Sequence, residues 1–224
     1  MHVGVFSDLH LRGPDDPTQG RFLRTLGAHP FDRLVLLGDI FEHWWHFGHD
    51  PFPAYRPVVD ALRGMPLVFV PGNHDFHALG FFRSELGAEG GAILSEVWDG
   101  RRVELLHGDQ VDRSFGYRAA SAVLRGPVMR ALLNTMGPKR AWRFLGDLAG
   151  PPGGTPSDVL VAAQLAEASR RIGAGAEIVL MGHTHVPGIY QMPGGCFVNV
   201  GDGMTHASWV SVRDGVPTMQ TLAP

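Results

Sequence analysis

Short apolar runs recur along the chain, and each ends in a cluster of polar residues. The runs cover residues 3–6, 34–37, 67–70, 103–106, 178–181 and 197–200. Runs of this length, bounded by Gly, Pro, Asn and Asp, are typical of buried β-strands. Helix-compatible segments at 20–28 and 55–63 separate the first runs, and this alternation indicates an α/β layered fold. In such folds ligands bind beyond the carboxyl ends of the strands, where these polar clusters fall.

The segment 113–148 interrupts the alternation of strands and helices, because its apolar residues have helical spacing and it contains no run typical of a strand. Gly126-Pro127 and Gly137-Pro138 divide it, and proline is tolerated in the first turn of a new helix. After it, Thr155-Pro156-Ser157-Asp158 resembles a capping box that opens a helix to about residue 172. Two late strands, 208–212 and 218–222, are joined by a hairpin turn at Asp214-Gly215. We expect one domain over residues 1–224, with 113–148 as a helical insert.

The balance of residue types excludes several classes of protein. The 224 residues contain 12 His but only 1 Cys, so neither an internal disulfide nor a thiolate zinc cage can form. A net charge of −3 gives no global basic field, so we expect no nucleic-acid partner. The sequence shows no sign of an obligate protein partner. No stretch approaches the roughly 20 apolar residues of a membrane span. The first residues lack a basic leader, so we expect no signal peptide and a cytoplasmic location.

The polar clusters together contain two carboxylates, one amide and four imidazoles. Each taken alone is more often a turn or capping residue than a ligand. As a set, oxygen and nitrogen donors without thiolate suit Mn²⁺, Fe²⁺, Zn²⁺ or Co²⁺. Seven groups exceed the needs of one catalytic ion, and they furnish two if one carboxylate bridges. The residues are Asp8, His10, Asp39, Asn73, His107, His183 and His185.

The polar clusters form five motifs in a fixed order: Asp8-Leu9-His10, Gly38-Asp39, Gly72-Asn73-His74-Asp75, His107-Gly108-Asp109 and Gly182-His183-Thr184-His185. This series resembles the motifs of the calcineurin-like metallophosphoesterases. The resemblance implies a β-sandwich of mixed sheets flanked by helices, with a dinuclear metal site. It also implies that Asp8, His10 and His185 hold one ion. Asn73, His107 and His183 would hold the other, and Asp39 would bridge. We expect two divalent ions, Mn²⁺ foremost, with Fe²⁺, Zn²⁺ and Co²⁺ as alternatives.

A narrower set of features comprises Gly38-Asp39-Ile40-Phe41-Glu42 with Trp44, Gly72-Asn73-x-Asp75-Phe76, the helical insert and the ending Asn199-Val200-Gly201-Asp202. In these features the chain resembles the bacterial UDP-2,3-diacylglucosamine hydrolases of lipid A synthesis. Those enzymes cleave a pyrophosphate bond to release UMP and lipid X. The chain departs from them at His74, where they have Arg, and at Gln110-Val111-Asp112-Arg113-Ser114, where they have an acidic segment. Another phosphodiester or phosphomonoester substrate, such as a cyclic nucleotide, phosphoprotein or small diester, therefore remains open.

We hypothesise that His74, oriented by Asp75, stabilises the transition state or protonates the leaving oxygen. Three candidate substrate contacts come from the motifs and four from the insert: Asn73, His74, His183, Arg113, Arg118, Lys139 and Arg140. Two interpretations of the insert stay open. In the first, its arginines are exposed to solvent and its apolar stripes pack against the rest of the protein. In the second, it covers the acyl chains of a substrate and attaches reversibly to an anionic membrane surface. Trp44, Trp45 and Phe47 form either a substrate wall or part of the core. A metal-free scaffold of the same fold is the non-enzymatic alternative.

Overall fold

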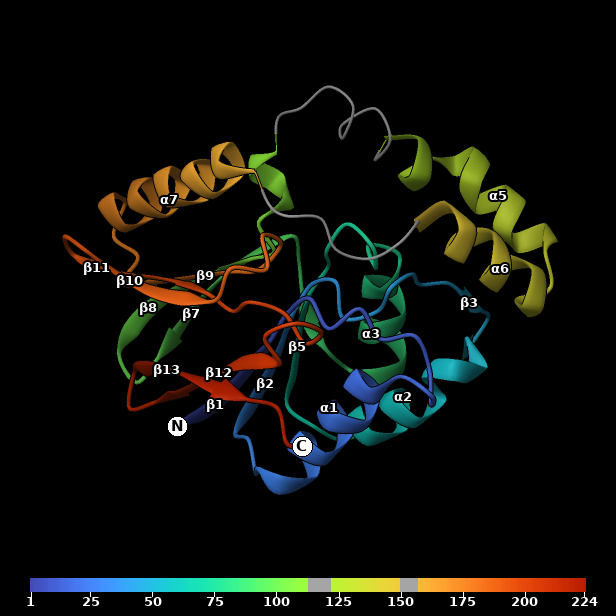
Figure 1. Cartoon of the computed structure of the whole chain (residues 1–224), viewed down its shortest axis with the longest axis horizontal. Helices are drawn as coiled ribbons and strands as arrows, with labels where there is room; N and C mark the ends of the chain where they lie inside the picture. Colours follow the sequence, from blue (N-terminus) through green and yellow to red (C-terminus); the bar gives the residue numbers. More distant parts are fainter. Residues whose placement is uncertain (113–121, 150–156) are drawn as a thin grey trace.

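Two β-sheets pack face to face in the computed structural model, which describes residues 1–112, 122–149 and 157–224 (Figure 1). The first sheet has the order β13 (Val216–Thr221), β12 (Ser208–Arg213), β1 (His2–Phe6), β2 (Arg33–Leu37), β5 (Leu67–Val70) and β6 (Glu89–Gly90). The second has the order β10 (Gly188–Met192), β11 (Gly195–Asn199), β9 (Ile178–Met181), β8 (Arg101–Leu106) and β7 (Ile93–Trp98). Parallel and antiparallel pairs occur in both sheets. The expected mixed-sheet β-sandwich is confirmed.

Alternate residues of the central strands enter two different cores. In β2, Val35 and Leu37 pack between the sheets, while Leu34 and Leu36 pack on the outer face beneath helices. Both sets are fully buried, because successive side chains of a strand point to opposite sides of the sheet. This two-sided burial explains why the strands are continuous apolar runs in the sequence.

Helices cover the outer faces of the sandwich. The first sheet is covered by α1 (Pro17–Ala28), α2 (Arg56–Leu62) and α3 (Ala78–Leu86), and α7 (Asp158–Gly173) packs on β9 and β11 (Figure 1). Asp16 caps α1 by accepting a hydrogen bond from the Thr18 amide, so this helix begins earlier than the expected residue 20. Ser157 caps α7 through the Leu160 amide. Short elements complete this part: β3 (His46–Phe47), β4 (Asp50–Pro51), and the 3₁₀ turns η1 (Pro53–Tyr55) and η2 (Asp109–Val111).

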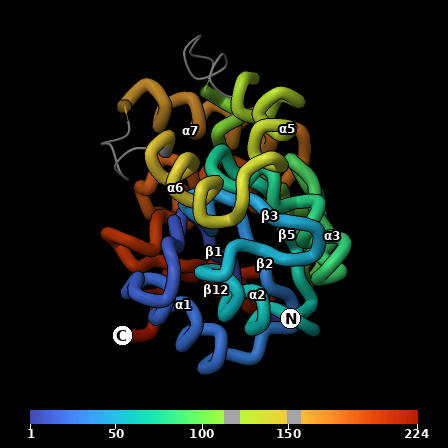
Figure 2. Tube along the Cα trace, turned by 90° about the vertical axis from the view of Figure 1, so that its right-hand side faces the viewer, coloured from blue at the N-terminus to red at the C-terminus, as the bar shows by residue number. Residues whose placement is uncertain are grey.

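The described part of the insert is helical, as expected. Residues 122–125 are helical, followed by α5 (Pro127–Thr135) and α6 (Pro138–Ala149), each of which begins at a proline. Figures 1 and 2 place α5, α6 and α7 at the same end of the molecule. Among the described residues, no helix is both long and apolar enough to cross a bilayer.

Candidate metal centre

Loops that follow five parallel strands carry the expected ligands. Asp8 and His10 follow β1, Asp39 follows β2, and Asn73 follows β5. In the second sheet, His107 follows β8, and His183 and His185 follow β9. Because β1, β2 and β5 are mutually parallel and β8 is parallel to β9, the ligands of each sheet lie together at the carboxyl ends of its strands. These ends of the two sheets meet, and the centre lies where they meet.

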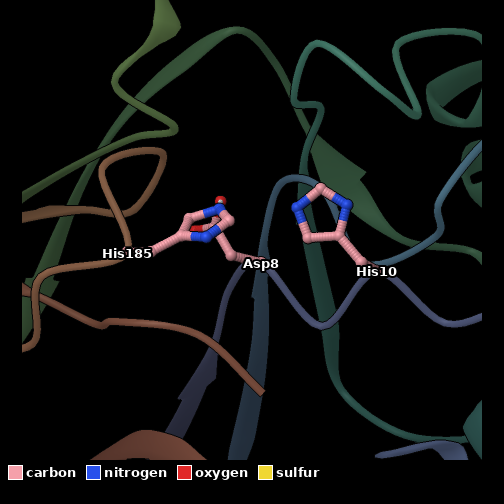
Figure 3. A group of neighbouring side chains, drawn as sticks. All are labelled: Asp8, His10 and His185. Atoms are coloured by element: carbon pink, nitrogen blue, oxygen red, sulfur yellow. Dashed lines mark ion pairs between the residues drawn. The ribbon is translucent and has the colours of Figure 1, made fainter. Parts of the chain in front are cut away.

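Asp8, His10 and His185 form one group of candidate ligands (Figure 3). The Asp8 Oδ1 atom lies 3.1 Å from His185 Nε2, and the His10 and His185 ring centroids are 5.3 Å apart. Asp8 is fully buried and His10 is nearly so. The Asp8 Oδ2 atom accepts hydrogen bonds from Ser7 Oγ and the His183 amide, which fixes the carboxylate and leaves Oδ1 for the group.

Asp39, His107 and His183 form the second group. His107 Nε2 lies 3.2 Å from Asp39 Oδ2, and the His107 and His183 rings are 5.2 Å apart. The Asn73 amide oxygen is buried and accepts no hydrogen bond from the described residues. Asp39, His107 and His183 therefore lie close together. The ligand role of Asn73 and the bridging role of Asp39 stay predictions.

The donor atoms fit divalent cations. The Leu37 carbonyl lies 2.9 Å from His107 Nδ1, and since a carbonyl only accepts, Nδ1 carries the hydrogen. The Nε2 atom therefore faces Asp39 Oδ2 and is the ring atom available to a cation. Within the described chain, Asp8 Oδ1, Asn73 Oδ1 and His107 Nε2 are buried without a hydrogen bond of good geometry. Buried polar atoms left in this way are costly unless a ligand satisfies them.

The electrostatic field of the centre also favours cations. Burial alone would raise the pKa of Asp39, but the His107 and His74 imidazoles lower it well below its usual range. Burial alone would lower the pKa of His107, but the Asp39 and Asp8 carboxylates raise it well above its usual range. The paired carboxylates thus stabilise a positive charge at this position.

The backbone at the centre is unusual. Asp8, His10, Asp39, His183 and His185 have φ between 47° and 69°, in the left-handed region that non-glycine residues seldom adopt. Two glycines make room for these turns. A Cβ atom on Gly72 would lie 2.1 Å from Asp39 Oδ1, and one on Gly182 would lie 2.1 Å from Asp8 Oδ2. Such strained positions gather at functional sites.

The expected orientation of His74 by Asp75 is wrong. The fully buried Asp75 carboxylate instead accepts hydrogen bonds from the amides of Gly72, Asp39 and Ile40. Burial and the neighbouring Asp39 carboxylate raise the pKa of Asp75 to about 6. The His74 ring contacts the Glu42 carbonyl through Nδ1 at 2.8 Å. Asp75 therefore holds the ligand loops together, and adjacent residues on this turn point in different directions.

The four substrate contacts predicted in the insert differ in where the structure places them. Arg113 and Arg118 lie outside the described residues, while Lys139 and Arg140 are exposed in the first turn of α6.

Sequence reasoning missed Arg125, whose Nη2 atom lies 3.2 Å from Asp109 Oδ2 and whose guanidinium lies over the Phe76 ring. Arg125 thus joins the insert to the motif loops. Trp44 and Trp45 are buried and pack in the core, with Phe47 against them.

Sequence reasoning also missed a buried amide network beneath the His183–His185 loop. Gln164 of α7 donates to the Gly182 carbonyl at 2.8 Å and accepts a hydrogen bond from Thr184 Oγ1 at 2.9 Å. Asn199 donates to Thr184 Oγ1 at 2.7 Å. The only sequence signal was the polar pattern around Thr184 and Asn199; Gln164 gave none, because it belongs to a helix distant in sequence.

A family model for calcineurin-like phosphoesterases matches residues 1–187. The chain belongs to this family. A UDP-2,3-diacylglucosamine hydrolase of Salmonella dublin is 30% identical over 212 residues, covering 86% of this chain and 85% of the relative. Another from Salmonella agona is 33% identical over 149 residues, covering 61% and 60%.

Solved structures share the fold at low identity. An archaeal phosphodiesterase has a TM-score of 0.56 at 12% identity, covering 99% of this chain and 100% of that chain. The phosphoesterase Yfce from E. coli has a TM-score of 0.51 at 18% identity, covering 99% and 93%. Family membership and the hydrolase relatives identify the protein as a metal-dependent phosphoester hydrolase.

Proposed function

We propose that this phosphoesterase hydrolyses the pyrophosphate bond of UDP-2,3-diacylglucosamine to give UMP and lipid X. The similarity to the Salmonella dublin hydrolase supports this substrate, since it extends over 86% of the chain. The observation that carries the proposal is the composition of the insert beside the metal centre. Val123, Val128, Leu132 and Leu148 are large apolar side chains that the insert exposes, and Val128 is 81% exposed. Apolar groups exposed beside basic ones suit a substrate with acyl chains and a diphosphate.

The seven motif residues would hold two ions: Asp8, His10, Asp39, Asn73, His107, His183 and His185. Mn²⁺ is the proposed metal, because the donor set is carboxylate, amide and imidazole without thiolate. When bound, such a pair of ions supplies a nucleophilic water and neutralises charge on the phosphoryl oxygens. His183 and Asn73 would also face the reacting phosphate.

His74 is the proposed catalytic residue of the chain. Its Nδ1–H donates to the Glu42 carbonyl, so Nε2 is the atom available to substrate. In the imidazolium form, Nε2–H would donate to a phosphoryl oxygen and transfer its proton to the leaving oxygen. The His74 amide donates to Asp39 Oδ1 at 2.8 Å, which ties the position of the ring to the metal centre.

The insert would bind the rest of the substrate. Lys139 and Arg140 are exposed and would contact the diphosphate, as would Arg113 and Arg118. The same basic and apolar surface supports reversible attachment at the inner face of the cytoplasmic membrane. A flotation assay with anionic vesicles at low salt tests this attachment, and a protein that stays unbound there refutes it.

A two-substrate assay tests the function. In Mn²⁺-supplemented buffer, the protein should convert UDP-2,3-diacylglucosamine to UMP and lipid X at a higher kcat/KM than it shows for bis-p-nitrophenyl phosphate. The His74→Ala variant serves as the matched control for contaminating hydrolases. Turnover of the generic diester alone would refute the lipid substrate and favour a small phosphodiester. No turnover of either substrate by metal-loaded protein would favour the scaffold alternative.

A further inference from the structure

Glu42 is a buried carboxylate next to two imidazoles of the centre. It is 5% exposed, and its Oε2 atom lies 3.4 Å from His10 Nδ1. Its Oε1 atom lies 3.9 Å from His74 Nδ1. The three residues form a third cluster of potential ligands, which shares His10 with the first. A carboxylate buried at this position needs an explanation, because an ionised group is costly to bury without partners.

Arg12 supplies the countercharge for Glu42. Its Nη2 and Nε atoms lie 3.2 and 3.3 Å from Glu42 Oε2. The guanidinium already neutralises the carboxylate, so the third cluster has no need of an ion of its own. Backbone pairing fixes the arrangement: the Leu11 amide donates to Ile40 and the Glu42 amide donates to Leu11. The segment after β1 therefore runs beside the segment after β2.

The contacts of Glu42 determine which nitrogen of each imidazole is free. Its main-chain carbonyl accepts from His74 Nδ1, as described above. Its side chain faces His10 Nδ1, where a carboxylate favours the hydrogen on that atom. Figure 3 shows the other ring nitrogen of His10 on the side of Asp8 and His185. That atom is Nε2, and its lone pair is then free for a cation.

We propose that Glu42, held by Arg12, is a positioning residue that fixes the tautomer and orientation of His10 for metal binding. The 3.4 Å between His10 Nδ1 and Glu42 Oε2 is within ion-pair distance, so the carboxylate lies where it can hold this ring atom. Carboxylates behind metal-binding imidazoles have this effect in other proteins, and their loss weakens metal affinity about 10- to 100-fold. The inference rests on the proposed role of His10 as a ligand.

Metal titration of the Glu42→Gln variant tests the inference. Metal-stripped protein is titrated with Mn²⁺ against a competing chelator, and the thermal unfolding of the stripped protein is recorded. We expect two binding steps in the wild type, and a loss of about 10- to 100-fold in affinity at one step in the variant. Glu85→Gln is the matched control, because Glu85 pairs with the exposed His49 at 2.8 Å, and both steps should stay as in the wild type.

The tautomer of His10 is read directly in a second measurement. Long-range ¹H–¹⁵N NMR of the metal-free wild type should show His10 protonated at Nδ1, and Glu42→Gln should populate the Nε2–H form. Unchanged affinity at both steps, or an Nε2–H tautomer in the wild type, overturns the inference. An equal loss at both steps with a lower Tm of the stripped variant also overturns it, because the role is then structural. A wild type that binds no Mn²⁺ refutes the proposed metal site itself.

Discussion

The Asp39 carboxylate contacts neighbours from two different segments of the chain. Oδ1 accepts the His74 amide and Oδ2 faces His107 Nε2, so the two oxygens have different partners. Gly72 approaches this carboxylate so closely that no side chain fits at that position. A carboxylate fixed on both oxygens by the fold is suited to bridge two cations.

Replacing Asp39 tests the bridge. The Asp39→Asn variant keeps the shape of the side chain and removes its charge, so both ions should be lost or strongly weakened. Elemental analysis of the purified protein gives the metal content per chain. Asp60→Asn is the control, because Asp60 pairs with Arg63 on the surface. A content of two ions per chain in Asp39→Asn would contradict the bridging role.

His74 is expected to contribute to turnover without contributing to metal binding. In His74→Ala the main-chain amide still donates to Asp39, so the metal content should stay at the wild-type value. Loss of a general acid lowers kcat by about 10² to 10⁴. Steady-state kinetics beside elemental analysis checks both, with the exposed His49→Ala as control. Wild-type kcat in His74→Ala would exclude the assigned role.

At the scale of elements, α6 is attached to the core through aromatic packing. The Trp142 ring lies 4.5 Å from His43 and 5.0 Å from Phe52. His43 is 7% exposed, and burial lowers its pKa to about 4. Both ring nitrogens lack hydrogen bonds among the described residues, so the packing requires the neutral ring. The insert therefore packs on the sandwich through a contact between Trp142 and the buried His43.

This histidine makes stability depend on pH. Because the pKa in the folded state lies below the unfolded value, the stabilisation is present above about pH 6.5 and is lost as the pH falls toward 4. Between about pH 7 and about pH 4.5, the loss from this group is about 2–3 kcal/mol. Urea unfolding at a series of pH values should show that His43→Phe removes this part of the dependence. A pH profile unchanged by His43→Phe would show that the ring titrates normally in the folded protein.

At the scale of the whole molecule, Arg33 connects the two sheets. From β2 it contacts Glu96 of β7 through two nitrogens, at 2.8 and 2.7 Å. Trp98 donates to the same carboxylate at 2.6 Å. The side chains of Arg33 and Glu96 are only 20% and 14% exposed. A bidentate ion pair shielded from solvent in this way joins the two sheets beside Trp98 of the core between them.

Breaking this pair should destabilise the whole fold. Arg33→Met leaves the Glu96 carboxylate without its main countercharge, and we expect the free energy of unfolding to fall by about 2–3 kcal/mol. Guanidinium unfolding measures the change. Arg56→Met is the matched control, because the Arg56–Asp50 pair is largely exposed and should contribute less than about 1 kcal/mol. Equal effects of the two substitutions would argue against the role of Arg33 as a connection between the sheets.

The sequence predicted the features that depend on a local residue pattern, namely the buried strands and the polar residues at their ends. Apolar runs such as 34–37 predicted buried strands, and their polar ends predicted where Asp39 and His107 meet. Contacts between distant segments carried no such signal. Glu42 reaches His10 only because the chain after β1 pairs with the chain after β2, and Arg125 reaches Asp109 only because the insert folds back. The direction of Asp75 depended on which amides the turn exposes, which the residue order does not specify.

The position of β1 inside its sheet has a consequence for how the protein is made. β1 pairs with β2 on one side and with β12 on the other, so that His2 lies opposite Arg213. During synthesis β1 and β2 leave the ribosome well before β12. Until then one edge of β1 has no partner, and a fully buried strand such as this one is prone to pair with other chains. The nascent chain should therefore depend on chaperone protection until β12 is translated.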